Sequence, residues 1–229
     1  SGGYATVDNY GSITGDTTSG VYLTKGKVTN HAGSKIYLTD SGADSSAILF
    51  AGYGEVENSG EIKGTGGIHF GVDGKVTNNA GGTITGTGGW GIIFGNSGTL
   101  INHGAIEGVT GVTFNMYNSG GSESINDTLT NSGTIIGTGG TAVDMSVGDD
   151  TANLLSGSSI TGNVDGGAGT DTVNLTGSGN ITNGILLNFE TIEKSGTGTF
   201  TLGGGLSSGN HISVFGGVIR ANGAFAHEA

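Results

Sequence analysis

This chain of 229 residues contains no cysteine and no proline, and it has only 7 lysines and arginines against 19 aspartates and glutamates. Without cysteine, neither a disulfide framework nor a thiolate metal site is available. The formal net charge of −12 would repel phosphate backbones, so we expect no nucleic-acid partner. The chain also lacks an apolar run of the roughly 18 residues that a membrane helix needs. It begins at Ser1 without a leader pattern, and we expect a mature or excised fragment.

Glycine is abundant in contrast. The 51 glycines make up about a fifth of the chain, against a usual share of roughly 7%. They follow no strict three-residue period, which excludes collagen, and the absence of proline argues against a Pro/Gly-rich disordered linker. Hydrophobic residues account for 33% of the chain and are spread evenly along it. A long, thin core fits this distribution better than a round one.

A short motif recurs through the first half of the chain, with an apolar residue first, asparagine third, and glycine and isoleucine after them. Its copies are VDNYGSITG from Val7, VTNHAGSKI from Val28, VENSGEIKG from Val56, VTNNAGGTITG from Val76, LINHGAIEG from Leu100 and LTNSGTIIG from Leu129. The motif asparagines are Asn9, Asn30, Asn58, Asn78, Asn102 and Asn131, and they lie 20 to 29 residues apart. A repeat of this length indicates a solenoid or an array.

Each repeat holds three short extended segments separated by Gly-rich corners. The third segments include 67–70 (GIHF), 91–94 (GIIF), 111–114 (GVTF) and 141–145 (TAVDM). Apolar residues never keep a helical spacing beyond one turn. A β-propeller would need a longer period, and a leucine-rich repeat needs a pattern that is missing. We therefore predict an all-β, single-stranded parallel β-helix of about nine to ten coils.

In this fold, the valines and isoleucines of the motif stack inward, and glycines allow the backbone conformations of the corners. The six motif asparagines would occupy one corner of successive coils, where their amides can form a ladder. Most of the aromatic residues on the third or loop segments are expected to stack in the core: Tyr22, Tyr37, Phe50, Phe70, Phe94 and Phe114. Trp90, Tyr53 and Tyr117 would supply a flat binding patch if they point outward.

The pattern changes near Val147, which divides the chain into residues 1–146 with the asparagine motif and residues 147–229. The second part contains GDDTANL from Gly148, SSITGNVDGGAGTDTVNL from Ser158, NFETIEKSG from Asn188 and GTFTLGG from Gly198. These segments resemble the passenger domains of type V autotransporters of Gram-negative bacteria, shortly before their outer-membrane β-barrel. The early NSGTIIG-type repeats are similar to the N-terminal coils of such passengers, and residues 211–225 resemble the start of their fold-promoting region.

The resemblance implies a right-handed parallel β-helix that crosses the outer membrane unfolded and is displayed at the cell surface or secreted. It also implies an outer-membrane β-barrel domain of the full-length protein as a partner. Many such passengers are adhesins or self-associating proteins. We accordingly expect a non-enzymatic scaffold, without a cofactor, that binds a host surface protein, a glycan or copies of itself. Its repetitive polar faces and projecting loops, such as 118–127, would make the contacts.

Two alternatives remain open at this point. The first is a β-helix enzyme that degrades polysaccharides, with its carboxylates between Asp144 and Asp171. The second is a passive spacer stalk of a larger passenger, with the active domain upstream. No HExxH or GxSxG motif is present, and the glycine motif GTGGWG from Gly86 lacks a βαβ context. We therefore predict no catalytic residues.

One segment suggests a metal. GGAGTDTV from Gly166 matches a nonapeptide that binds calcium when it occurs in tandem, but no tandem copy follows it here. Asp150 and Asp171 lie one coil apart, so we expect them to cap corresponding turns. If they align, their like charges would raise a pKa or attract a cation. The weak calcium candidates are Asp149, Asp150, Asp165 and Asp171. The same carboxylate separation would suit a retaining glycosidase, but a Gly-flanked corner offers no pocket.

Overall fold

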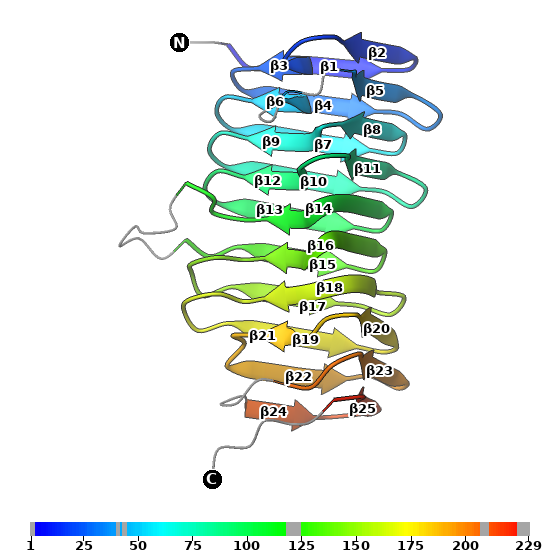
Figure 1. Ribbon diagram of the computed structural model, residues 1–229, viewed down its shortest axis with the longest axis vertical. Coiled ribbons are helices and arrows are strands. Elements are labelled where there is room, and N and C mark those ends of the chain that lie inside the picture. The colour runs from blue at the N-terminus through cyan, green and yellow to red at the C-terminus, as the bar shows by residue number, and fades with distance from the viewer. Residues whose placement is uncertain (1–2, 40–41, 43–44, 118–124, 207–210, 224–229) are drawn as a thin grey trace.

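The computed structural model describes residues 3–39, 42, 45–117, 125–206 and 211–223. Over these residues the chain forms strands and no helix, and it therefore has no helix that could span a membrane. Each strand pairs in parallel with the equivalent strands of the coils before and after it. The coils stack into the rod shown in Figure 1. The predicted all-β parallel β-solenoid is confirmed.

The first sheet forms one long face of the rod and takes one strand from each coil. Its strands in order are β1 (Ala5–Asn9), β4 (Gly26–Asn30), β7 (Gly54–Asn58), β10 (Gly74–Asn78), β13 (Gly98–Asn102), β15 (Thr128–Asn131), β17 (Thr151–Leu154), β19 (Thr172–Thr176), β22 (Thr191–Ser195) and β24 (His211–Val214). Ten successive strands are separated by nine steps of one coil, in agreement with the predicted number. The sheet runs without a break across Val147, so the described parts of the predicted segments 1–146 and 147–229 belong to one continuous solenoid.

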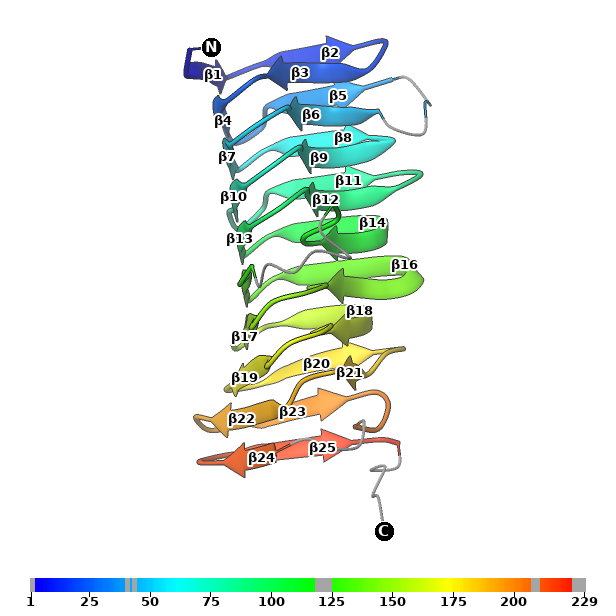
Figure 2. The same ribbon diagram turned by 90° about the vertical axis from the view of Figure 1, so that its left-hand side faces the viewer.

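The second sheet has fifteen strands and covers the remaining sides of the rod, as the turned view in Figure 2 shows. Its main path is β2 (Ser12–Gly15), β5 (Lys35–Leu38), β8 (Glu61–Gly64), β11 (Thr83–Gly86), β14 (Ala105–Thr113), β16 (Thr134–Asp144), β18 (Ser159–Asp165), β20 (Gly179–Thr182), β23 (Thr199–Leu202) and β25 (Val218–Ala221). The third segments are separate strands in five coils: β3 (Ser19–Leu23), β6 (Ser46–Phe50), β9 (Gly66–Phe70), β12 (Trp90–Phe94) and β21 (Leu186–Leu187). In β14 one long strand forms both the second and the third segment, because β12 pairs with its second half.

Inward residues of successive coils meet in register and form continuous columns. One column of the first sheet contains Val28, Val56, Val76, Leu100, Leu129, Ala152, Val173 and Ile192. A column of the second sheet contains Ile36, Ile62, Ile84, Ile106, Ile135, Ile160 and Ile181. Both columns are buried. In first-sheet strands such as β7 and β10, the alternate residues are more exposed, as the two-residue period of a strand requires.

Four phenylalanines stack at the corner between the third segments and the first sheet. Phe50, Phe70, Phe94 and Phe114 are fully buried, and neighbouring ring centroids lie 4.9 to 5.1 Å apart with nearly parallel planes. The rings leave no room for a side chain at the start of the adjacent strand. A Cβ added at Gly98 would lie 2.5 Å from a ring carbon of Phe114. Glycine is therefore required there for close approach.

The two tyrosines that were expected in the core point outward instead. Tyr22 is 58% exposed, and Tyr37 lies between the buried residues Ile36 and Leu38 on the same strand. Since successive side chains of a strand alternate between faces, Tyr37 must face outward. The phenylalanine part of the prediction is correct, and the tyrosine part is wrong.

Truncating one ring of the phenylalanine stack should destabilise the rod. Phe94→Ala removes a buried ring that contacts a neighbour on both sides, and we expect the free energy of unfolding to fall by about 3 to 5 kcal/mol. Denaturant titration followed by circular dichroism measures the change. The control is Phe215→Ala, because Phe215 is 74% exposed and its loss should cost less than about 0.5 kcal/mol. Equal losses in the two variants would contradict close packing of the stack.

Candidate functional site

The six motif asparagines lie at the C-terminal end of successive first-sheet strands and form one hydrogen-bonded ladder. From Asn9 to Asn102, each side-chain Nδ2 donates to Oδ1 of the next asparagine along the rod, at 2.7 to 2.9 Å. Each Nδ2 also donates to a backbone carbonyl of the next coil, for example from Asn78 to Ala105 at 3.2 Å. The asparagines are buried, so the ladder satisfies polar groups that would otherwise be costly.

The ladder ends at Asn131. Its Nδ2 donates to the carbonyl of Gly133 at 3.1 Å, because the next place in the column belongs to Leu154. Leu175 and Lys194 follow in the same column. Lys194 is fully buried, and its ammonium donates to three backbone carbonyl oxygens of neighbouring turns. Along this column the asparagine amides are thus followed by two leucines and then by a lysine whose ammonium is bound by backbone carbonyls.

Acidic residues form a second column at the other end of the first-sheet strands, from β15 onward. Asp127, Asp150, Asp171 and Glu190 each come directly before a threonine that begins a first-sheet strand. A carboxylate oxygen of each accepts the backbone N–H of the residue one coil earlier. The acceptor–donor distances are 2.5 Å to Gly98, 2.6 Å to Asp127, 2.8 Å to Asp150 and 2.6 Å to Asp171. We call Asp127, Asp150 and Asp171 the acid stack, and Glu190 closes it at the exposed end.

The acid stack continues the corner that the phenylalanine rings fill in the earlier coils. Glycine begins the strand where a ring fills the corner, as at Gly98. The phenylalanine stack ends at Phe114, and one coil later Asp127 stands where Gly98 stood. An inward carboxylate thus takes the place of a glycine. Sequence analysis found Asp150 and Asp171 but missed Asp127 and Glu190. The repeated acid–threonine pair was the signal that could have found them.

Burial raises the pKa of all three members of the acid stack. The pKa is raised to about 8 for Asp127, about 7 for Asp150 and about 6 for Asp171, because desolvation penalises the ionised form. The backbone N–H bond to each carboxylate lowers the pKa, and neighbouring carboxylates raise it further. Each side chain is at most 1% exposed. The second oxygen, Oδ2, is buried in all three and has no hydrogen-bond partner among the described residues.

The structure does not bring the four calcium candidates together. Asp150 and Asp171 belong to the acid stack and cap corresponding turns. Asp149 lies at the surface, where its Oδ1 accepts the N–H of Thr170 at 2.9 Å. Asp165 accepts the side-chain amide of Asn188 at 2.7 Å. In the part of the chain that is described, no three histidine, cysteine, aspartate or glutamate side chains converge as metal ligands.

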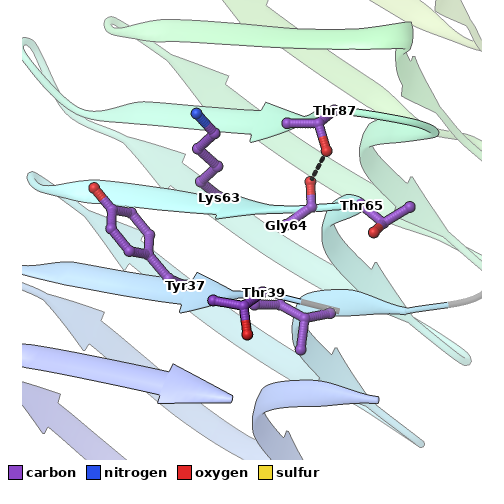
Figure 3. Close-up of a pocket in the computed structure, with 7 residues that line it drawn as sticks. Tyr37, Thr39, Lys63, Gly64, Thr65 and Thr87 are labelled. Atoms are coloured by element: carbon purple, nitrogen blue, oxygen red, sulfur yellow. Dashed lines mark hydrogen bonds between the residues drawn. The ribbon is translucent and has the colours of Figure 1, made fainter. Parts of the chain in front are cut away.

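A groove of about 410 Å³ lies on the outer face of the second sheet, across β5, β8 and β11. Its lining residues are Tyr37, Leu38, Thr39, Lys63, Gly64, Thr65 and Thr87. Figure 3 shows Tyr37 and Lys63 toward one end and Thr65 and Thr87 toward the other. None of the described residues that line the groove carries a carboxylate. Sequence analysis missed it, because its walls come from three coils and only the stacking register makes them neighbours.

Contacts with neighbouring side chains hold the aromatic ring of the groove in place. The Tyr37 hydroxyl donates to the Glu61 carboxylate, and the Lys35 ammonium lies 5.4 Å from the ring centroid. The hydroxyl of Thr87 donates to the carbonyl of Gly64 at 3.0 Å, which leaves its oxygen able to accept a further hydrogen bond. A ring, an ammonium and hydroxyl groups are suited to a hydroxyl-rich polar ligand.

The other aromatic candidates lie away from the groove lining. Tyr53 is 40% exposed, and Tyr117 is 62% exposed. The Tyr117 hydroxyl is hydrogen-bonded to Nε2 of His69 at 2.8 Å. Trp90 is partly buried at the start of β12. The predicted projecting loop, 118–127, falls largely outside the described residues, which resume at 125.

Breaking the asparagine ladder at its middle should destabilise the rod. Asn78→Ala removes the donor to Asn102 and the acceptor of Asn58, and it leaves the buried Oδ1 of Asn102 without this donor. We expect the free energy of unfolding to fall by about 2 to 4 kcal/mol. The matched control is Asn79→Ala, which removes one hydrogen bond to Ser59 outside the ladder and should cost about 0.5 kcal/mol. Denaturant titration measures both changes. If the free energy of unfolding fell equally in both variants, the ladder would not contribute more to stability than an ordinary hydrogen bond.

No family model, no curated protein and no solved structure matches this chain. Its function must therefore be inferred from the chemistry of the asparagine ladder, the acid stack and the groove.

Proposed function

We propose that this chain is a non-enzymatic binding rod of the autotransporter-passenger type, an adhesin that contacts glycans through the groove at Tyr37 and Lys63. The observation that carries the proposal is the composition of the groove. It presents an aromatic ring held by its neighbours, an ammonium group and threonine hydroxyls, and none of its described lining residues carries a carboxylate. Sugars offer apolar faces to aromatic rings and hydroxyl groups to polar side chains.

Several features support a passenger that is displayed at the surface of a Gram-negative bacterium or secreted. Each coil contacts mainly its neighbours, so the rod can form one coil at a time from an unfolded chain. The absence of cysteine and the small number of basic residues suit a chain that crosses an oxidising compartment before folding. The resemblance in residues 147–229 points to the same secretion class.

A repetitive polar face offers a second contact surface to a host protein or to another copy of the rod. Five outward threonines stand in register on the first sheet: Thr99, Thr128, Thr151, Thr172 and Thr191. This column presents hydroxyl groups at the coil spacing of about 4.8 Å. It lies on a different sheet from the groove, so the two surfaces can be tested separately.

The enzymatic alternative receives less support. A glycosidase needs two carboxyl groups that face the substrate. Asp150 and Asp171 are instead buried, and each accepts a backbone N–H. The spacer-stalk alternative predicts that the groove binds nothing.

Replacing the ring of the groove should weaken glycan binding. We expect Tyr37→Ala to reduce affinity for a bound glycan about tenfold, because a stacked ring contributes about 1 to 1.5 kcal/mol. Lys63→Ala should reduce binding most for acidic glycans. Glycan-array screening of the chain followed by calorimetry of hits measures both effects. Tyr10→Ala is the control, since Tyr10 is 78% exposed and lies outside the groove.

The same screen separates the remaining functions. Binding that persists unchanged in Tyr37→Ala and Lys63→Ala would remove the groove from the proposal. If no glycan binds and the rods associate with one another, self-association is the function. If neither occurs, the spacer role is favoured, and product release from a polysaccharide panel would indicate an enzyme.

A further inference from the structure

We propose that the acid stack of Asp127, Asp150 and Asp171 is a proton-binding site that makes the rod more stable in acid than in alkali. The site is independent of the groove and of the proposed adhesin function. It rests on the geometry of three consecutive coils, in which inward carboxyl groups succeed one another at the same corner.

The two oxygens of each carboxyl group have different surroundings. One oxygen accepts a backbone N–H from the coil before. The other, Oδ2, is buried without a partner in the described part of the chain. An ionised oxygen in this position loses its hydration and gains nothing in return, which is costly. A proton on Oδ2 removes the charge and creates a donor.

The asparagine ladder, at the opposite end of the earlier first-sheet strands, is an example of a polar column in which each side chain is hydrogen-bonded to the next. Each amide there accepts through Oδ1 and donates through Nδ2 to the next coil, as Asn58 does to Asn78 at 2.9 Å. A protonated carboxyl group has the same combination of one acceptor and one donor. Coils lie about 4.8 Å apart, so a carboxyl O–H can reach toward the acid of the neighbouring coil. An ionised carboxylate, which only accepts, cannot complete such a column.

The charged groups around the acid stack further favour the protonated form of its carboxyl groups. The negative charge of Asp73 raises the pKa of Asp127, and that of Asp149 raises the pKa of Asp150 and Asp171. The charges of Asp165 and Glu190 also raise the pKa of Asp171. All of them are acidic. The three ion pairs of the described residues join Lys27 to Glu57, His31 to Asp8 and Lys35 to Glu61, so none of them neutralises the stack. Among the described residues, no three histidine, cysteine, aspartate or glutamate side chains converge to bind a metal ion that could supply a positive charge.

The direction of the pH effect follows from the raised pKa values. Carboxyl groups that titrate near 4 when unfolded titrate at about 6, 7 and 8 when folded. The folded chain therefore binds more protons than the unfolded chain between these limits, and stability falls as pH rises through this window. Near pH 6.5 the difference is about two protons, so the unfolding equilibrium constant should rise roughly 100-fold per pH unit.

The experiment measures unfolding of the full chain at pH 5, 6.5 and 8 by thermal denaturation and calorimetry. The wild type should have a higher Tm at pH 5 than at pH 8 and should release about two protons on unfolding at pH 6.5. The triple variant Asp127→Asn, Asp150→Asn, Asp171→Asn carries neutral amides in the stack. It should lose this pH dependence and match or exceed the wild-type Tm at pH 8. Asp149→Asn, which removes a neighbouring exposed charge, should keep most of the wild-type slope.

Each outcome bears on the proposal. A wild-type Tm that is flat or falls between pH 8 and pH 5 would overturn it, as would an unchanged slope in the triple variant. If the triple variant does not fold, each single Asn variant should release fewer protons than the wild type at pH 6.5. The reduction should be about one proton for Asp127→Asn, smaller for Asp150→Asn and smallest for Asp171→Asn, in the order of their pKa values. A Tm rise on adding calcium or magnesium chloride alone at pH 8, absent from the Asn variants, would replace the proton site with a cation site.

Discussion

The whole structure depends on one constraint, which is that each inward side chain stacks on the side chain at the same position one coil away. A residue type persists in a column only if it is compatible with itself at about 4.8 Å. Isoleucine and valine meet this condition by packing. Phenylalanine meets it by offset stacking of its rings, and asparagine by donating from its amide nitrogen to the next amide oxygen. The isoleucine, phenylalanine and asparagine columns of this rod follow this rule.

Aspartate is the exception, because two ionised carboxylates repel each other and neither can donate. The acid stack nevertheless places three of them in succession at a buried corner. The backbone N–H groups of the adjacent coil satisfy half of each carboxyl group, and the other half remains open. The corner that phenylalanine rings fill in the first coils therefore holds carboxyl groups that can bind protons in the later coils. Two halves of one solenoid can share a fold and respond differently to their surroundings.

The outer surface restricts residue type less than the core does, so a binding groove there leaves no repeated pattern in the sequence. Outward side chains stack in register too, but water tolerates almost any succession of them. The groove arises where Tyr37, Lys63 and Thr87 come from three coils and face the same side. Nothing in their sequence spacing distinguishes them from other outward residues. The composition of the groove thus depends on the register between coils rather than on a sequence motif.

The sequence by itself determined the solenoid, the three segments per coil, the inward valines and isoleucines, and the position of the asparagines. These features repeat, and a repeat of about 20 to 30 residues constrains the fold strongly. Only the tertiary structure decided that Tyr37 faces outward, that Asp127 joins Asp150 and Asp171, and that the buried oxygens lack partners. The physical reason is that such properties depend on which residues meet across coils. Coil lengths vary along this chain, so the register between coils follows from packing and not from residue number.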